Sequence, residues 1–186
     1  MSVAAEQKTK TLKNYVGGSW VEVTGAELHD VINPATGAAI ARVPFSTAAN
    51  LDDAVQAAKA ALPAWRGVST IARARKLFEL REKLEARKDE IARCVVTEMG
   101  KTFPDARAEV GRMIEMVEAA TAIPTTMQGR ILEDVARGVD AETIRQPVGV
   151  CAAIAPFNFP AMVPFWFLPF AIACGNTFVL KPSEQV

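Results

Sequence analysis

The stretch QPVGVCAAIAPFNFPAMVPFWFLPFAIACGNTFVL, residues 146–180, contains no Asp, Glu, Lys or Arg. An uncharged run of this length is expected to lie out of water, either as a membrane span or at the centre of a folded domain. Its repeated prolines would interrupt a spanning helix, and Asn158 and Asn176 would lie in hydrocarbon. The stretch therefore predicts the interior of a folded domain.

The stretch divides into a strand, a helix and a second strand. Residues 148–155 are apolar and partly β-branched, which predicts a strand buried on both faces. Residues 160–174 have the length of a helix, begin with a proline suited to the first helical position and end before Gly175-Asn176, a helix stop. Residues 177–180 predict a second buried strand. This order predicts a βαβ unit with a parallel strand pair.

Polar residues return at the two predicted strand ends, Ala155-Pro156-Phe157-Asn158 and Lys181-Pro182-Ser183-Glu184. Ligands of βαβ units bind beyond such carboxyl ends, although the glycine-rich phosphate fingerprint is absent here. The Asn158 carboxamide beside a helix N-terminus could hold a developing oxyanion or simply cap the helix. Lys181 and Glu184 suit the hydroxyls of a ribose, and the carboxylate favours NAD over NADP; a solvated surface pair is the alternative.

The composition excludes several function classes. In 186 residues, 21 basic side chains balance 21 acidic ones, so charge gives no case for nucleic acid or an anionic membrane surface. The three cysteines show no CxxC spacing and the first eleven residues lack an apolar signal core, which favours a reduced, cytoplasmic protein. A single histidine makes a tetrahedral metal site improbable.

The rest of the chain predicts a small β region followed by helices. A disordered tail over 1–11 precedes a hairpin around Gly17-Gly18 and a strand at 38–43. The expected helices cover 50–62, 70–87, 89–99 and 104–122, with Arg73 on the wet side of the second and Lys101 as a helix C-terminal residue. Residues 131–145 read as an extended ribbon. Two parallel strands cannot complete a sheet of this kind, so we expect the chain to be a fragment.

Several motifs resemble the aldehyde dehydrogenase superfamily. They are IAPFNFP at 154–160, FVLKPSE at 178–184, and in the amino-terminal part INPATG at 32–37 and EMGKT at 98–102. Residues 145–184 are most similar to the methylmalonate-semialdehyde dehydrogenase branch, which acylates coenzyme A. The resemblance implies an α/β fold made of the amino-terminal part of the aldehyde dehydrogenase fold. It comprises helices, an incomplete Rossmann-like parallel sheet and part of an oligomerisation ribbon.

The resemblance also implies a domain division and an assembly. Residues 12–130 would form the β-hairpin and helical part of the cofactor-binding domain, 131–147 the ribbon of the oligomerisation element, and 148–186 the first βαβ unit of the NAD-binding domain. Relatives form dimers and tetramers, so the complete protein is expected to be a homo-oligomer.

The motif positions carry expected site roles. Asn158 matches the asparagine that holds the oxyanion, and Arg112 matches an arginine proposed to grip a substrate carboxylate, with a salt bridge on the wet side of a helix as its alternative. NAD and the co-substrate coenzyme A are the implied cofactors. The residues expected beside NAD are Ala155, Pro156, Phe157, Lys181, Ser183, Glu184 and Gln185.

The nucleophilic cysteine and the general-base glutamate of the family match nothing in this chain, so Cys94, Cys151 and Cys174 are interpreted as structural. The complete protein is expected to oxidise a small acidic semialdehyde, malonate or methylmalonate semialdehyde, to an acyl-coenzyme A, while this chain alone is expected to be inactive. One alternative is a hydrolytic, NAD(P)-dependent aldehyde dehydrogenase. Another is a non-catalytic fragment that acts as an interaction module.

Overall fold

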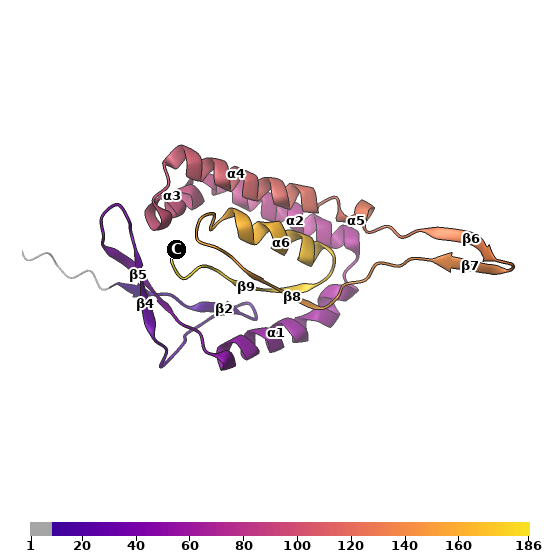
Figure 1. The fold of residues 1–186 in the computed structure, drawn as a ribbon, viewed down its shortest axis with the longest axis horizontal. Coiled ribbons are helices and arrows are strands. Elements are labelled where there is room, and N and C mark those ends of the chain that lie inside the picture. The colour runs from indigo at the N-terminus through magenta and orange to yellow at the C-terminus, as the bar shows by residue number, and fades with distance from the viewer. Residues whose placement is uncertain (1–8) are drawn as a thin grey trace, which may run out of the picture.

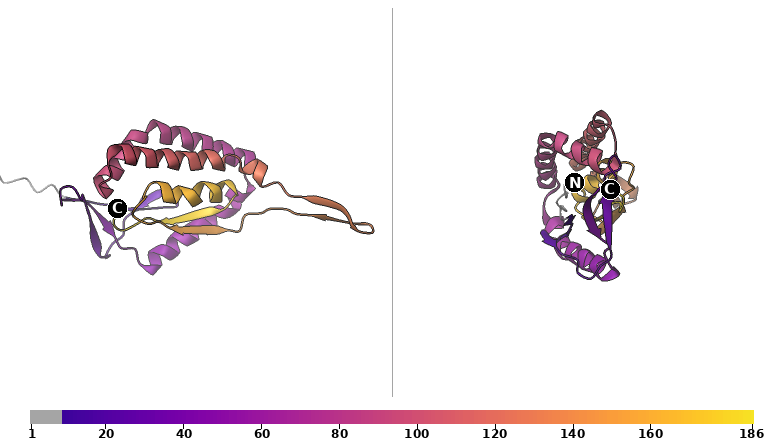
Figure 2. Two further views of the ribbon diagram at one scale, coloured as in Figure 1. Left: turned by 45° about the horizontal axis from the view of Figure 1, so that its top comes forward. Right: turned by 90° about the vertical axis from the view of Figure 1, so that its left-hand side faces the viewer.

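In the computed structural model, which describes residues 9–186, the uncharged stretch forms the predicted βαβ unit. Strands β8 (Val150–Ile154) and β9 (Thr177–Lys181) pair in parallel, and the last residues of the two strands are direct partners. Helix α6 (Met162–Ala173) connects them. In the views of Figure 1 and Figure 2, α6 lies over one side of this strand pair and α1 (Ala48–Gly67) lies over the other.

A layer of helices packs on the far side of α6 (Figure 1). It contains α2 (Thr70–Ala86), α3 (Lys88–Met99), α4 (Phe103–Ala120) and the short α5 (Ile123–Thr126). The buried side of α4 follows helical spacing and forms the centre of the core. Its buried residues are Ala106, Glu109, Val110, Met113, Ile114, Val117 and Ala120. Between α3 and α4, Gly100 takes the left-handed conformation that ends a helix, with φ +83°.

Short strands precede the helices. They are β1 (Lys10–Thr11), β2 (Asn14–Val16), β3 (Ser19–Val21), β4 (Leu28–Ile32) and β5 (Ala39–Pro44). Strands β2 and β3 form the predicted hairpin around Gly17-Gly18, while β5 pairs with both β1 and β4. Residues 1–8 of the predicted tail lie outside the described residues, and Lys10 and Thr11, assigned to the same tail, form β1 instead.

The predicted ribbon is an antiparallel hairpin of β6 (Ile131–Ala136) and β7 (Val139–Glu142). It extends away from the body of the molecule, at the end opposite the amino-terminal strands (Figure 1). Every residue of both strands is exposed, including the large apolar side chains of Ile131, Leu132 and Val135. The extended ribbon was predicted correctly, but its apolar side chains are uncovered in the isolated chain.

Three local predictions differ from the structure. The helix expected to end at Leu62 continues through Pro63 to Gly67. The helix expected to begin at Pro160 begins at Met162, after a turn. Neither strand of the pair is fully buried as predicted: Ile154 of β8 is 80% exposed and Leu180 of β9 is also exposed, because over the described residues β8 and β9 pair only with each other.

The placement of Arg73 on the wet side of its helix was wrong. Arg73 lies one turn before the buried Leu77 on the packed side of α2 and is 4% exposed. Its Nε donates to the carbonyl oxygen of Ala173 at 2.8 Å, and its Nη1 donates to that of Val68. These two acceptors are what allow a guanidinium to be buried there.

Candidate functional site

The ends of the two parallel strands meet, as predicted. The amide of Ala155 donates to the carbonyl oxygen of Lys181 at 2.9 Å, and Ala155 is buried. The next three residues, Pro156, Phe157 and Asn158, are exposed. The first predicted loop therefore begins from a fixed point and reaches solvent at the carboxyl edge of the strand pair, the edge at which ligands bind in such sheets.

The second loop carries a charged pair. The ammonium of Lys181 donates to a carboxylate oxygen of Glu184, and both side chains are about half exposed. This hydrogen bond lowers the pKa of Glu184, with smaller contributions from a backbone hydrogen bond and the Lys181 charge, so the carboxylate is ionised at neutral pH. The hydroxyl of Ser183 accepts from the amide of Gln185 at 3.1 Å, which closes the loop. Donors and an anionic acceptor thus face solvent beyond β9.

Asn158 is not the cap of the following helix. Helix α6 has no side-chain cap of its own, and the amides of Ala161 and Met162 donate to Oε1 of Glu109 at 2.9 and 3.2 Å. Glu109 reaches them from the buried side of α4. This arrangement removes the capping alternative for Asn158, and the carboxamide of Asn158 takes part in no hydrogen bond within residues 9–186.

Lys101 holds the same loop at Asn158. Its Nζ donates to the backbone oxygen of Asn158 at 2.8 Å and to Oε2 of Glu109 at 2.6 Å. It also lies 3.7 Å from the centre of the Phe159 ring, a cation–π contact. Lys101 was expected to be a helix C-terminal residue; it follows α3 by two positions and its side chain turns to the predicted site.

Arg112 lies on α4, one turn beyond Glu109. Its Nη1 donates to Oε2 of Glu115 at 2.8 Å, and its side chain is 69% exposed. The structure thus shows the surface ion pair that was the alternative for this arginine. It does not bring Arg112 into contact with the 155–158 loop over the described residues. An exposed i, i+3 pair is weak, so the guanidinium can exchange its partner at low cost.

Two of the three cysteines, Cys94 and Cys174, are poorly suited to nucleophilic attack. Burial raises the pKa of the Cys94 thiol, and the neighbouring Glu98 and Glu90 raise it further. Burial also raises the pKa of Cys174, although the Arg73 charge opposes this. A raised thiol pKa keeps the reactive thiolate scarce at neutral pH.

Among residues 9–186 no group of His, Cys, Asp and Glu could hold a metal ion, and no helix there is long and apolar enough to cross a bilayer.

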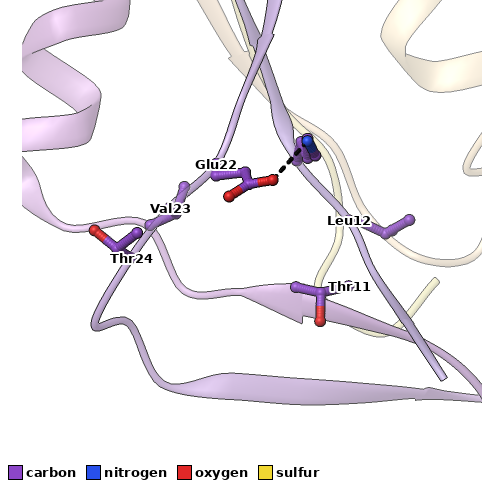
Figure 3. A pocket seen from close by; sticks show the side chains of 6 residues that line it. Thr11, Leu12, Glu22, Val23 and Thr24 are labelled. Carbon is purple, nitrogen blue, oxygen red and sulfur yellow. Dashed lines mark ion pairs between the residues drawn. The ribbon is translucent and has the colours of Figure 1, made fainter. Parts of the chain in front are cut away.

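A shallow surface pocket of about 230 Å³ opens beside the amino-terminal strands (Figure 3). Its lining residues are Thr11, Leu12, Lys13, Glu22, Val23 and Thr24. The ion pair between Lys13 and Glu22 crosses it at 2.7 Å. None of the predicted site residues lines this pocket, so we do not associate it with the 155–158 and 181–185 loops.

The sequence analysis did not predict that Lys101 and Glu109 contact residues 158–162. A usable signal existed for Glu109, because it falls among apolar residues at the helical spacing 106, 109, 110 and 113. A carboxylate on the packed side of a helix requires partners. No comparable local signal marks Lys101.

Several solved structures share this fold. A methylmalonate-semialdehyde dehydrogenase from Oceanimonas doudoroffii matches with a TM-score of 0.92 and 41% identity, covering 95% of this chain and 36% of that chain. A Sinorhizobium meliloti structure assigned to the same activity and complexed with NAD matches with a TM-score of 0.93 and 38% identity, covering 97% of this chain and 37% of that one.

Curated relatives agree with the structures. Malonate-semialdehyde dehydrogenase 2 of Bacillus mycoides is 52% identical over 179 residues, which is 96% of this chain and 37% of the relative. A protein of the same name from Geobacillus thermodenitrificans is 53% identical over 178 residues, with the same coverage. This chain therefore spans about 37% of the length of these relatives. The family model described as aldehyde dehydrogenase family matches residues 20–186, nearly the whole chain. The protein accordingly belongs to the aldehyde dehydrogenase family.

Proposed function

We propose that the complete gene product containing this chain oxidises malonate or methylmalonate semialdehyde with NAD and releases the product as an acyl-coenzyme A. The observation that supports this most directly is the meeting of the 155–158 and 181–185 loops at one strand edge, through the Ala155–Lys181 hydrogen bond. The names of the relatives, which share half of their aligned residues with this chain, support the choice of substrate.

The second loop fits the ribose of a dinucleotide. Lys181 supplies hydrogen-bond donors and Glu184 an ionised acceptor, and both are exposed at the end of β9. A vicinal diol needs this combination, and a carboxylate beside the 2′-hydroxyl repels a 2′-phosphate. When bound, NAD would take up the hydride that leaves the aldehyde carbon. Ala155, Pro156 and Phe157 would border the cofactor from the first loop.

Asn158 is proposed to donate to the oxyanion that develops on the aldehyde oxygen. Its carboxamide is not used to cap α6, because Glu109 performs that function. A nucleophile is also required, and we place it outside residues 1–186, since no cysteine lies in the 155–158 or 181–185 loop and the raised thiol pKa values of Cys94 and Cys174 disfavour attack by either. A general base outside these residues is part of the same proposal.

Arg112 is proposed to bind the carboxylate of the semialdehyde. Its present partner is an exposed Glu115, and releasing such a pair costs roughly 0.3–0.5 kcal/mol. A bidentate contact with a substrate carboxylate in a less exposed site would exceed that cost.

The complete protein is also proposed to be a homo-oligomer, with the uncovered β6–β7 ribbon packed on another copy.

Product analysis tests the proposed reaction. The complete gene product is incubated with malonate semialdehyde, NAD and coenzyme A, and NADH and acyl-coenzyme A are quantified together. Equal amounts of the two products are expected. Free acid with NADH and no thioester would establish the hydrolytic alternative, and sustained NADH production by residues 1–186 alone would refute an external nucleophile.

Two substitutions test the residue roles. Asn158→Ala should lower kcat by about 100- to 1000-fold, as loss of an oxyanion donor does elsewhere. Arg112→Met should raise KM for an acidic semialdehyde while leaving an uncharged aldehyde of equal length unaffected. The matched control is Arg107→Met, which is on the same helix as Arg112 and removes an exposed ion pair with Asp89 of α3. Equal effects of Arg112→Met and Arg107→Met would refute the substrate role.

A further inference from the structure

We propose that Lys101 and Glu109 act as a positioning pair that fixes the loop 156–161, and with it Asn158, in the geometry used for oxyanion binding. This inference rests on the proposed function, because it assigns the pair a purpose in that reaction. Neither residue belongs to the predicted site, and each reaches the loop from an earlier helix or its connection.

Glu109 fixes the end of the loop. One carboxylate oxygen accepts from the amides of Ala161 and Met162, and the other accepts from Nζ of Lys101 at 2.6 Å. The Glu109 side chain is 1% exposed, so water cannot substitute for these donors. All hydrogen bonding of this carboxylate is therefore directed to the loop or to the residue that holds the loop.

Lys101 fixes the loop at Asn158. The same ammonium that contacts Glu109 donates to the backbone oxygen of Asn158 at 2.8 Å and lies over the ring of Phe159. The two side chains thus connect Asn158 to the first turn of α6 through a single ion pair. Residues 158–162 therefore cannot move away from Lys101 and Glu109 without breaking a hydrogen bond to a charged group.

A role in geometry explains the pair better than a role in stability. Buried ion pairs contribute no more to stability, as a rule, than apolar residues of the same volume. Here the pair lies at 15% and 1% exposure beneath the one loop that carries the proposed oxyanion donor. Displacing a catalytic group by about 1 Å can cost about 100-fold in rate. Lys101 and Glu109 contact backbone, so they are positioning residues for Asn158.

The kinetic test uses the complete gene product with NAD and a semialdehyde. Lys101→Met should lower kcat about 100-fold while KM for NAD changes much less, because the ribose-binding pair Lys181 and Glu184 is on the other loop and Lys101 contacts Asn158, beyond the cofactor-bordering Pro156 and Phe157. Lys101→Arg, which keeps a donor, should recover part of the loss. Arg107→Met is the control and should match the wild type.

Partial unfolding is separated from loss of positioning by a double variant. Lys101→Met leaves Glu109 buried without its cation, whereas Lys101→Met with Glu109→Gln leaves no unpaired charge. The double variant should regain thermal stability but keep the kcat defect. Recovery of kcat together with stability would overturn the proposal, as would an unchanged kcat in Lys101→Met.

Amide hydrogen exchange supplies a readout that does not depend on activity. In Glu109→Leu, the amides of Ala161 and Met162 should exchange roughly tenfold faster, whereas Arg107→Met should leave them unchanged. Unchanged exchange in Glu109→Leu would refute the anchoring itself. A wild-type protein that lacks dehydrogenase activity but shows this exchange pattern would refute the proposed function and leave the anchoring intact.

Discussion

Replacing Arg73 by Met removes a charge that lies inside the protein. Arg73 is 4% exposed on α2 and donates to two backbone oxygens, those of Ala173 at the end of α6 and Val68 before α2. Burial lowers the pKa of its guanidinium. Arginine nevertheless stays protonated in proteins, so the buried group carries its charge. Methionine retains an apolar stem of similar length and removes both hydrogen bonds.

The expected loss of stability follows from the two hydrogen bonds. Hydrogen bonds from a charged donor contribute about 1.5–3 kcal/mol each, so the pair sets an upper range of about 3–6 kcal/mol. Methionine recovers part of this, because an apolar side chain avoids the cost of burying a charge. The carbonyl oxygen of Ala173, which is 1% exposed as a residue, is left without its donor. We therefore expect a net loss of about 2–4 kcal/mol, or roughly 4–16 °C in Tm.

Thermal unfolding followed by circular dichroism measures this loss. Arg75→Met is the matched control, because Arg75 lies on the same helix and is exposed. Its effect should stay within about 0.5 kcal/mol. A Tm for Arg73→Met equal to that of Arg75→Met would show that the buried guanidinium contributes nothing and would refute the reasoning. Arg73→Lys should lie between the two, since an ammonium cannot reproduce the fork of donors.

Three further outcomes are expected. Gly100→Ala should lower the free energy of unfolding by about 1–2 kcal/mol in a denaturant titration, because Gly100 has φ +83° and the new Cβ would lie 2.8 Å from Cγ of Pro34. The control is Gly67→Ala, which should be neutral or stabilising because no atom lies within 4 Å of the new Cβ. An NMR titration should show the pKa of Glu184 rising in Lys181→Met, because the Lys181 hydrogen bond is the main cause that lowers it. Because the pKa of Glu184 is lower in the folded state than in the unfolded state, the Lys181–Glu184 pair stabilises the folded state above the unfolded pKa of Glu184, about 4.3. This stabilisation is lost as the pH falls through the folded pKa of Glu184. The thiol of Cys94 should react slowly with a thiol reagent at neutral pH and faster above its ordinary pKa of 9.0, because burial raises that pKa.

The sequence predicted those helices and strands that are marked by an apolar run with turn residues at its ends. The βαβ unit over 148–180, the hairpin around Gly17-Gly18 and the helix ending at Gly100 each follow from apolar runs bounded by turn residues. Strand β4 was not predicted, because its sequence LHDVI has little apolar alternation and its extended form depends on pairing with β5. The exposure of Ile154 was also missed, since burial depends on neighbouring elements and not on the strand itself.

In the candidate site too, some features could be predicted from the sequence and others could not. The positions of the two polar loops follow from strand order, so the meeting of Ala155 and Lys181 was predictable. The contacts of Lys101 with Asn158 join positions 57 residues apart, and nothing in the EMGKT motif alone indicates them. The ion pair of Arg112 with Glu115 was one of two alternatives, and sequence could not choose between a surface pair and a substrate contact.

Residues 146–180 carry no charge, whereas Arg73 and Glu109 are buried charges on other helices. One cause explains both observations. Helix α6 has unsatisfied amides at its start and unsatisfied carbonyls at its end, and its own apolar sequence has no charged side chain for either. Glu109 accepts from the amides, and Arg73 donates to the carbonyl of Ala173. An anion at the N-terminus and a cation at the C-terminus also match the sign of the helix dipole. A helix whose own sequence carries no charge therefore takes its charged partners from α2 and α4, and this accounts for the burial of Glu109 and Arg73.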